Sequence, residues 1–134
     1  MQVLVALLLT TLGDVVLCSV SLVMTMMIRD EAVNIKSNLA LWLPSIDYFV
    51  FLVDERTKDD SKIAIASILE GKAMGYKIID YTFEGFGQAR TMSLDRAYEH
   101  FPQATHVWIA DPDWRPEAST IVKNDLDMNH DAYR

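Results

Sequence analysis

Two aspartates separated by one residue are the groups in this sequence best suited to chemistry. Asp111 and Asp113 follow the apolar residues 107–110 in the stretch THVWIADPDWRP. In an extended segment, residues two apart point the same way, so both carboxylates would face one spot. Two adjacent like charges repel each other unless a proton or a cation lies between them. Because carboxylate oxygens suit Mg²⁺ or Mn²⁺, which also bind phosphate oxygens, the pair predicts a divalent cation site.

Other acidic residues follow the other apolar runs of the chain. Asp30 and Glu31 come after the first run, and Asp54 and Asp59 lie in the segment after the second. In open α/β sheets, ligands bind at the carboxyl ends of the strands, so these acids are expected at one edge of the sheet with Asp111. Asp and Glu also favour helix N-termini, so helix capping is the alternative for those that precede predicted helices.

The elements that would position these acids begin with four apolar runs rich in β-branched residues. Near-continuous apolar runs are typical of strands that are covered on both faces. The predicted strands are residues 19–28, 47–53, 76–81 and 105–110.

Segments with helical spacing of apolar residues lie between the predicted strands. These segments are residues 30–43, 59–75 and 87–101, with Pro44, Gly71 and Pro102 as their predicted breakers. The order β-α-β-α-β-α-β with short connections indicates right-handed crossovers. The predicted fold class is therefore α/β: an open, mostly parallel, Rossmann-like sheet with flanking helices.

Length and composition indicate one globular domain. The chain has 134 residues, and 51% of them are hydrophobic. Its net charge of -7 argues against nucleic acid as a partner, because nucleic-acid binding favours basic surfaces that release counterions. A polyanionic ligand can still bind such a protein when a metal ion supplies positive charge.

The apolar N-terminal segment, residues 1–18, is open to three interpretations. It contains no Lys or Arg, so the positive region of a signal peptide is missing, and Gly13 and Asp14 would interrupt a membrane anchor. The third interpretation is a strand or helix packed on the domain. A signal or anchor would direct the protein to the secretory pathway or a membrane, with membrane association through this segment; otherwise the expected location is cytoplasmic.

Four motifs in order resemble those of glycosyltransferase family 2, whose nucleotide-sugar-binding domain has the GT-A fold. The resemblance covers about residues 19–120, the GT-A-like domain of the chain. The family motifs are a K-N-E-E-like segment, a D-x-G-S-T-D-x-T-like loop, an F-x-x-A-R-N-x-A-L-like helix start and an L-D-A-D-E-like metal motif. The corresponding stretches are IRDEA at 28–32, VDERTKDDS at 53–61, FGQARTMSL at 86–94 and IADPDW at 109–114.

The resemblance implies that six residues bind the donor nucleotide, of which the sixth, Asp111, also belongs to the metal motif. Asp54 would contact the base, Asp59 would lie near the base and ribose, and Arg90 would approach the base or the diphosphate. Asp30 and Glu31 stand in the first of the four motifs, at the donor nucleotide.

The metal motif of the family falls on Asp111 and Asp113. The resemblance implies that Asp111 faces the ribose and the metal, and that Asp113 coordinates the metal directly. The implied cofactor is Mn²⁺ or Mg²⁺, which neutralises the diphosphate of the donor. The implied activity is transfer of a sugar from a nucleotide diphosphate to an acceptor hydroxyl; the sequence specifies neither the sugar nor the acceptor.

Two features of the sequence depart from the family pattern. Arg56 and Thr57 stand where the second loop usually has Gly and Ser. The family's general base comes from a later segment, whereas residues 121–134 read as an acidic tail in which no carboxylate is marked as a base. The chain is therefore expected to be the donor-binding half of a longer enzyme, and a truncated or degenerate nucleotide-binding protein without catalysis is the alternative.

A phosphatase or phosphotransferase of the haloacid-dehalogenase-like class is a further alternative. In that class the D-x-D motif follows the first strand and ends in Thr or Val, whereas here it follows the fourth and the fifth position is Arg115. The position of the motif therefore favours the glycosyltransferase interpretation. The sheet would keep an open edge after the fourth strand, and this edge is expected to pair with a partner.

Overall fold

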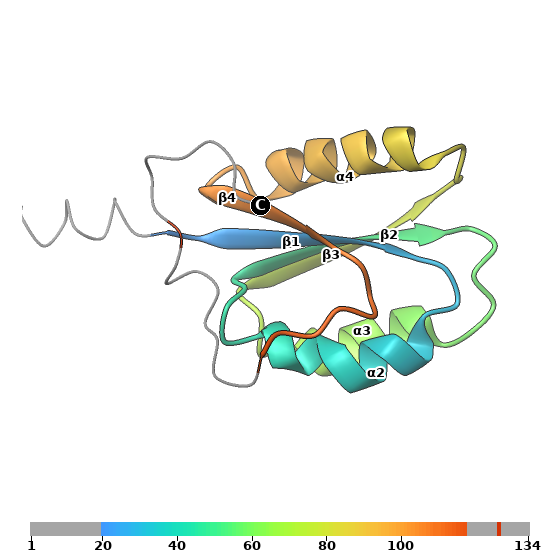
Figure 1. The fold of residues 1–134 in the computed structure, drawn as a ribbon, viewed down its shortest axis with the longest axis horizontal. Coiled ribbons are helices and arrows are strands. Elements are labelled where there is room, and N and C mark those ends of the chain that lie inside the picture. Colours follow the sequence, from blue (N-terminus) through green and yellow to red (C-terminus); the bar gives the residue numbers. More distant parts are fainter. Residues whose placement is uncertain (1–19, 118–125, 127–134) are drawn as a thin grey trace, which may run out of the picture.

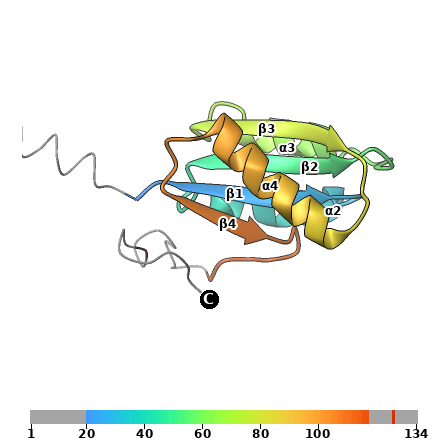
Figure 2. The same cartoon turned by 90° about the horizontal axis from the view of Figure 1, so that it is seen from above.

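A parallel sheet of four strands forms the centre of the molecule (Figure 1). The computed structural model describes residues 20–117 and residue 126. The strands are β1 (Leu22–Ile28), β2 (Tyr48–Asp54), β3 (Gly75–Tyr81) and β4 (His106–Ala110). The strand order is β3-β2-β1-β4, and every pair is parallel. Figure 2 shows the four arrows pointing the same way, with β3 and β4 at opposite edges.

Helices cover both faces of the sheet. Helix α4 (Phe86–His100) crosses one face, and α2 (Ala32–Asn38), the 3-10 turn η1 (Leu39–Trp42) and α3 (Ser61–Leu69) cover the other (Figure 1). This arrangement confirms the predicted α/β, Rossmann-like fold class.

The boundaries of two predicted helices differ from those observed. The predicted helix 30–43 is divided into α2 and η1, and the predicted helix 59–75 ends at Leu69. Gly71, the predicted breaker, has a φ of 71°, a left-handed conformation that glycine adopts without strain. The 3-10 turn η1 ends at Trp42, two residues before Pro44, although Leu43, the residue before the proline, still has α-region dihedral angles (φ -54°, ψ -37°).

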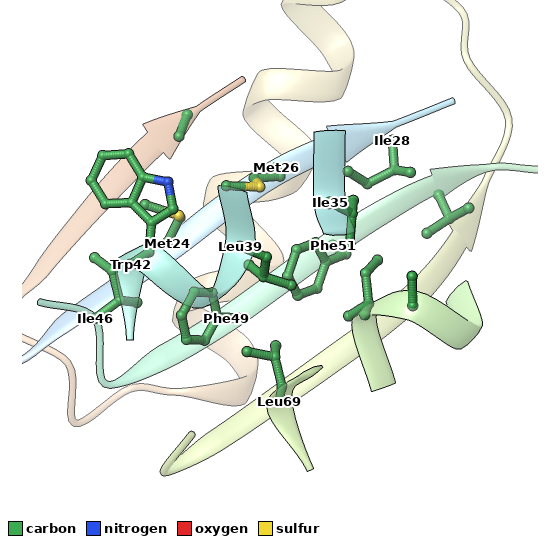
Figure 3. Close-up of a cluster of buried hydrophobic side chains, with 14 of the residues drawn as sticks. Met24, Met26, Ile28, Ile35, Leu39, Trp42, Ile46, Phe49, Phe51 and Leu69 are labelled. Atoms are coloured by element: carbon green, nitrogen blue, oxygen red, sulfur yellow. The ribbon is translucent and has the colours of Figure 1, made fainter. Parts of the chain in front are cut away.

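Residues alternate between two apolar layers along the central strands. On one face, Met24 and Met26 of β1 pack with Phe49 and Phe51 of β2 beneath α2 and α3 (Figure 3). On the other face, Val23 of β1 and Val50 and Leu52 of β2 pack against α4, which contributes the buried Ala89 and Ala97. Burial on both faces explains why these strands read as near-continuous apolar runs.

The two edges of the sheet differ in charge. The β3 edge carries the exposed residues Lys77 and Asp80, and charged side chains protect an edge from unwanted pairing. The β4 edge has no charged residue, and Val107 and Ile109 are 42% and 39% exposed. Among the described residues β4 pairs only with β1, so the partner expected at this edge stays a prediction.

The terminal segments fall largely outside the described part of the chain. The N-terminal segment 1–18 lies outside it, as does the tail 121–134 except for Leu126, which packs against the apolar layer beneath α2 and α3. Over residues 20–117 and 126, no helix has the length and apolarity needed to cross a membrane.

Replacing Phe49 with Ala tests the importance of the layer beneath α2 and α3. Phe49 is fully buried and stacks on Phe51 at a centroid distance of 6.1 Å. Because the change leaves a cavity at the centre of the sheet, the free energy of unfolding should fall by about 3–5 kcal/mol in urea titrations. Val33→Ala is the control, since Val33 is 79% exposed and its loss should change stability by only about 0.5 kcal/mol.

Candidate functional site

A pocket of about 380 Å³ lies at the carboxyl ends of the four strands. Its size is within the usual range for small-molecule sites. Strand order reverses between β1 and β4, and ligands of open α/β sheets bind beside such a reversal. The pocket is lined by Met27, Ile28, Arg29, Glu31, Asn34, Asp54, Tyr81, Phe83, Phe86, Asp111, Pro112 and Asp113.

The strand order gives the pocket two chemically different ends. Asp111 and Asp113 follow β4, whereas Asp54 ends β2 on the other side of β1. Neighbouring strands are about 4.8 Å apart, so the ends of β2 and β4 are separated by roughly 10 Å. Phe83 lies between β3 and α4, and Phe86 is the first residue of α4; their rings, with centroids 5.1 Å apart in an edge-to-face arrangement, add an aromatic wall to the pocket. We call the part of the pocket lined by Asp111 and Asp113 its acidic end, and the part lined by Phe83 and Phe86 its aromatic wall.

The segment that carries Asp111 and Asp113 is a turn, not the extended strand that the sequence suggested. The backbone N–H of Trp114 donates to the carbonyl oxygen of Asp111 at 3.0 Å, which closes a four-residue turn. Asp at the first position and Pro at the second favour such turns, so Pro112 redirects the chain directly after β4. The reasoning from strand geometry was therefore wrong, although both carboxylates line the same pocket.

Two contacts from the helical layer hold this turn. The side-chain amide of the buried Asn38 donates to the carbonyl oxygen of Pro112 at 3.1 Å. The indole N–H of Trp42 donates to the carbonyl oxygen of Trp114 at 3.4 Å. The sequence pattern does not mark Asn38 as a site residue, but its place on the buried face of a helix, three residues after Ile35, is a signal of a buried polar contact.

Asp54 is buried at the end of β2 and is paired with Arg56. The guanidinium donates from Nε to Oδ1 at 3.0 Å and from Nη2 to Oδ2 at 2.6 Å. The backbone N–H of Arg56 also donates to Oδ1, at 2.9 Å. These hydrogen bonds, first those of the guanidinium, outweigh burial and lower the pKa of Asp54 to about 2. Asp54 is therefore an ionised carboxylate whose charge is balanced by Arg56, and it still lines the pocket.

The remaining pocket carboxylates differ in their partners. Glu31 accepts a hydrogen bond from the side-chain amide of Asn34 at 2.7 Å. Asp111 and Asp113 are exposed, and neither side chain has a hydrogen bond or an ion pair with any residue that the structure describes. The two free carboxylates of the pocket are thus together at its acidic end.

Three of the predicted nucleotide-binding residues do not line the pocket. Asp30 accepts hydrogen bonds from the backbone N–H groups of Lys58 and Asp59, and Arg90 is exposed on α4. Asp59 accepts from the backbone N–H of Ala32 at 2.9 Å and from both the N–H and the hydroxyl of Ser61. Asp59 thus joins the first turns of α2 and α3, as the capping alternative predicts.

The pKa of Asp59 reflects this network. Burial raises it, but the hydrogen bonds from Ser61 and Ala32 outweigh burial and leave the pKa below its usual value. Asp59 is thus held as an ion by groups of the fold, and a direct contact of Asp59 with a nucleotide stays a prediction.

The donor atoms of the acidic end fit a hard divalent cation. In residues 20–117 and 126, no group of three or more His, Cys, Asp or Glu side chains is arranged to hold a metal ion. Mg²⁺, however, commonly binds only one or two protein carboxylates and completes its shell with waters and substrate phosphates. Asp111 and Asp113 supply that smaller donor set.

Comparison of the chain with models of protein families, with curated proteins and with solved structures found no match. The resemblance to glycosyltransferase family 2 therefore rests on the four motifs alone.

Asn38→Ala tests how firmly the turn after β4 depends on the helical layer. The change leaves the carbonyl oxygen of the buried Pro112 without its donor, so the free energy of unfolding should fall by about 1–3 kcal/mol. Urea titration measures the loss. Ser37→Ala is the control because the neighbouring Ser37 is exposed. Equal stability of the two variants would contradict an anchoring role for Asn38.

Arg56→Met should change how stability depends on pH. Because the pKa of Asp54 lies below that of an unfolded Asp, the ion pair stabilises the fold fully above about pH 4 and progressively less as pH falls toward the folded pKa. Without Arg56 this contribution is lost. The free energy of unfolding should fall at neutral pH, and its decline below about pH 4 should become shallower. Urea titrations across this pH range measure both effects.

Arg96→Met is the matched control for the pH series. Arg96 pairs with Glu99 on the surface of α4, and exposed pairs contribute little to stability. Identical pH profiles for wild type and Arg56→Met would contradict the assigned role of the Asp54–Arg56 pair.

Proposed function

We propose that this chain binds a nucleotide-diphospho-sugar through a divalent cation, as the donor-binding domain of a glycosyltransferase. The observation that carries the proposal is one pocket that combines two free carboxylates at its acidic end with an aromatic wall. A nucleoside diphosphate combines a charged diphosphate with a flat base in the same way. The distance of roughly 10 Å between the ends of β2 and β4 suits a ligand of this length.

The acidic end supports binding of the diphosphate. Asp111 and Asp113 repel an anion unless a cation lies between them and the ligand, and these residues would hold Mn²⁺ or Mg²⁺. Such an ion, when bound, stabilises negative charge on the diphosphate as it leaves the sugar. Asn38 and Trp42 keep the turn in position through its carbonyl oxygens, which leaves both carboxylates free.

The aromatic wall supports binding of the base. Phe86 is 67% exposed, and its ring meets that of Phe83, so a base can stack on this wall. Asp54 lines the same pocket, where it can accept a hydrogen bond from the base. Transfer then exchanges the bond between the anomeric carbon and the diphosphate oxygen for a bond to the acceptor oxygen, and the acceptor's proton passes to a base.

Nucleotide binding without transfer is a second candidate. The Asp54–Arg56 pair is the observation behind it, because Arg56 stands where the family motif has Gly and occupies a motif carboxylate, a departure expected of a degenerate member of the family. One assay distinguishes the two functions. A transferase releases UDP from a UDP-sugar when an acceptor is present, whereas a binding protein does not.

The melting temperature in the presence of millimolar UDP and Mn²⁺ tests the proposal. A ligand at about ten times its Kd adds about 1.4 kcal/mol to the stability of the native state. This corresponds to a rise of several degrees for a domain of this size. Asp113→Ala should abolish the rise, because it removes one of the two free carboxylates.

Asp95→Ala is the matched control for this experiment. It removes the same charge from an exposed position on α4, outside the pocket, and should leave the rise intact. An unchanged melting temperature of the wild type would contradict the proposal. An equal rise without Mn²⁺, or in Asp113→Ala, would contradict the role of the cation.

A further inference from the structure

The partner of Asp54 is a residue of this chain's own loop. Arg56 directs Nε and Nη2 at the two carboxylate oxygens, at 3.0 and 2.6 Å. Its side chain is 48% exposed, whereas that of Asp54 is 3% exposed. Arg56 does not line the pocket itself. Its influence on a ligand would therefore act through Asp54.

We propose that Arg56 sets the nucleobase preference of the pocket by occupying Asp54, an inference that rests on the proposed nucleotide-binding function. Arg56 is thus a positioning residue, and the group that meets the base is Asp54. With Arg56 in place, the pocket discriminates little between bases that differ in their ring N–H group. Without Arg56, it prefers bases that donate from that position.

Counting acceptor positions supports this inference. Oδ1 of Asp54 accepts from the Nε and the backbone N–H of Arg56, which uses both of its lone pairs. Oδ2 accepts from Nη2 and keeps one lone pair. The guanidinium also neutralises the charge, so a hydrogen bond from a base to Oδ2 is weaker than one to a free carboxylate. The pair therefore removes most of the recognition that Asp54 can give.

The backbone keeps Asp54 in place when the Arg56 side chain is changed. The N–H of residue 56 donates to Oδ1 whatever its side chain, and the N–H of Thr57 donates to the carbonyl oxygen of Asp54 at 2.9 Å. Arg56→Met preserves an unbranched apolar stem and removes the guanidinium. It should therefore free the carboxylate without redirecting it.

Bases of equal size that differ in their hydrogen-bonding edge provide the probes. Uracil and guanine donate from a ring N–H group, whereas cytosine and adenine have an acceptor nitrogen at the same ring position. The ratio of UDP to CDP affinity compares two pyrimidines, and the ratio of GDP to ADP affinity compares two purines. Each ratio isolates the hydrogen bond from the size of the ring.

The experiment measures the affinities of the four nucleoside diphosphates in Mn²⁺ by calorimetry on the full chain. In Arg56→Met, both ratios should rise roughly tenfold over wild type, as expected for one added hydrogen bond to a charged acceptor. The double variant Arg56→Met/Asp54→Asn should lose the rise, because it lacks the freed carboxylate. Arg96→Met, which removes an arginine from a surface pair, should match wild type.

The possible results separate this inference from the proposed function. If nucleotides bind but Arg56→Met leaves both ratios unchanged, the role of Arg56 is refuted and nucleotide binding stands. A rise that persists in the double variant also refutes it. If no nucleotide binds wild type or Arg56→Met, both proposals fail. Should Arg56→Met not fold, Arg56→Lys replaces it, because lysine lacks the planar fork that engages both oxygens.

Discussion

The parallel pairing of β1 with both β2 and β4 is the constraint on which the site depends. Ile28 is aligned with Val53 of β2, and Met26 with Ala110 of β4, so the residues that follow these strands emerge at one edge of the sheet. Both faces of β1 and β2 are buried, and polar groups of these strands therefore concentrate where the strands end. The pocket follows from this arrangement, because all four strands end beside it.

Hydrogen bonds within the fold determine which pocket carboxylates remain available. Glu31 and Asp54 each have a side-chain partner, whereas Asp111 and Asp113 have none within the described residues. The turn after β4 is instead held by its backbone carbonyls, which accept from the helical layer. Anchoring through the backbone keeps the two side chains free. An acidic pocket thus acquires one end where a cation can bind, and one carboxylate, Asp54, whose charge is already balanced by Arg56.

The sequence predicts the strands well and the contacts between distant segments poorly. The apolar runs locate all four strands to within three residues, since burial on both faces leaves a strong pattern. The turn at Asp111 depends on Asn38, 74 residues earlier, and no local pattern records such a contact. Helix capping by Asp59 similarly joins α2 and α3 across the chain. Local patterns therefore identified the acidic residues. Tertiary contacts decide which of them line the pocket, as Asp111 and Asp113 do, and which stabilise the surrounding helices, as Asp59 does.

Asp54 shows why a matching residue alone is weak evidence for a binding role. Its type and its place at the end of β2 agree with the family motif, yet the residue two positions later decides how much of its carboxylate remains available to a ligand. A glycine at position 56 could not form this pair, since it has no side chain. The departure from the motif at position 56 thus changes the chemistry of the matching position, and the two residues act as one unit. In a small pocket, what a carboxylate can bind depends on its neighbours as much as on its position in the fold.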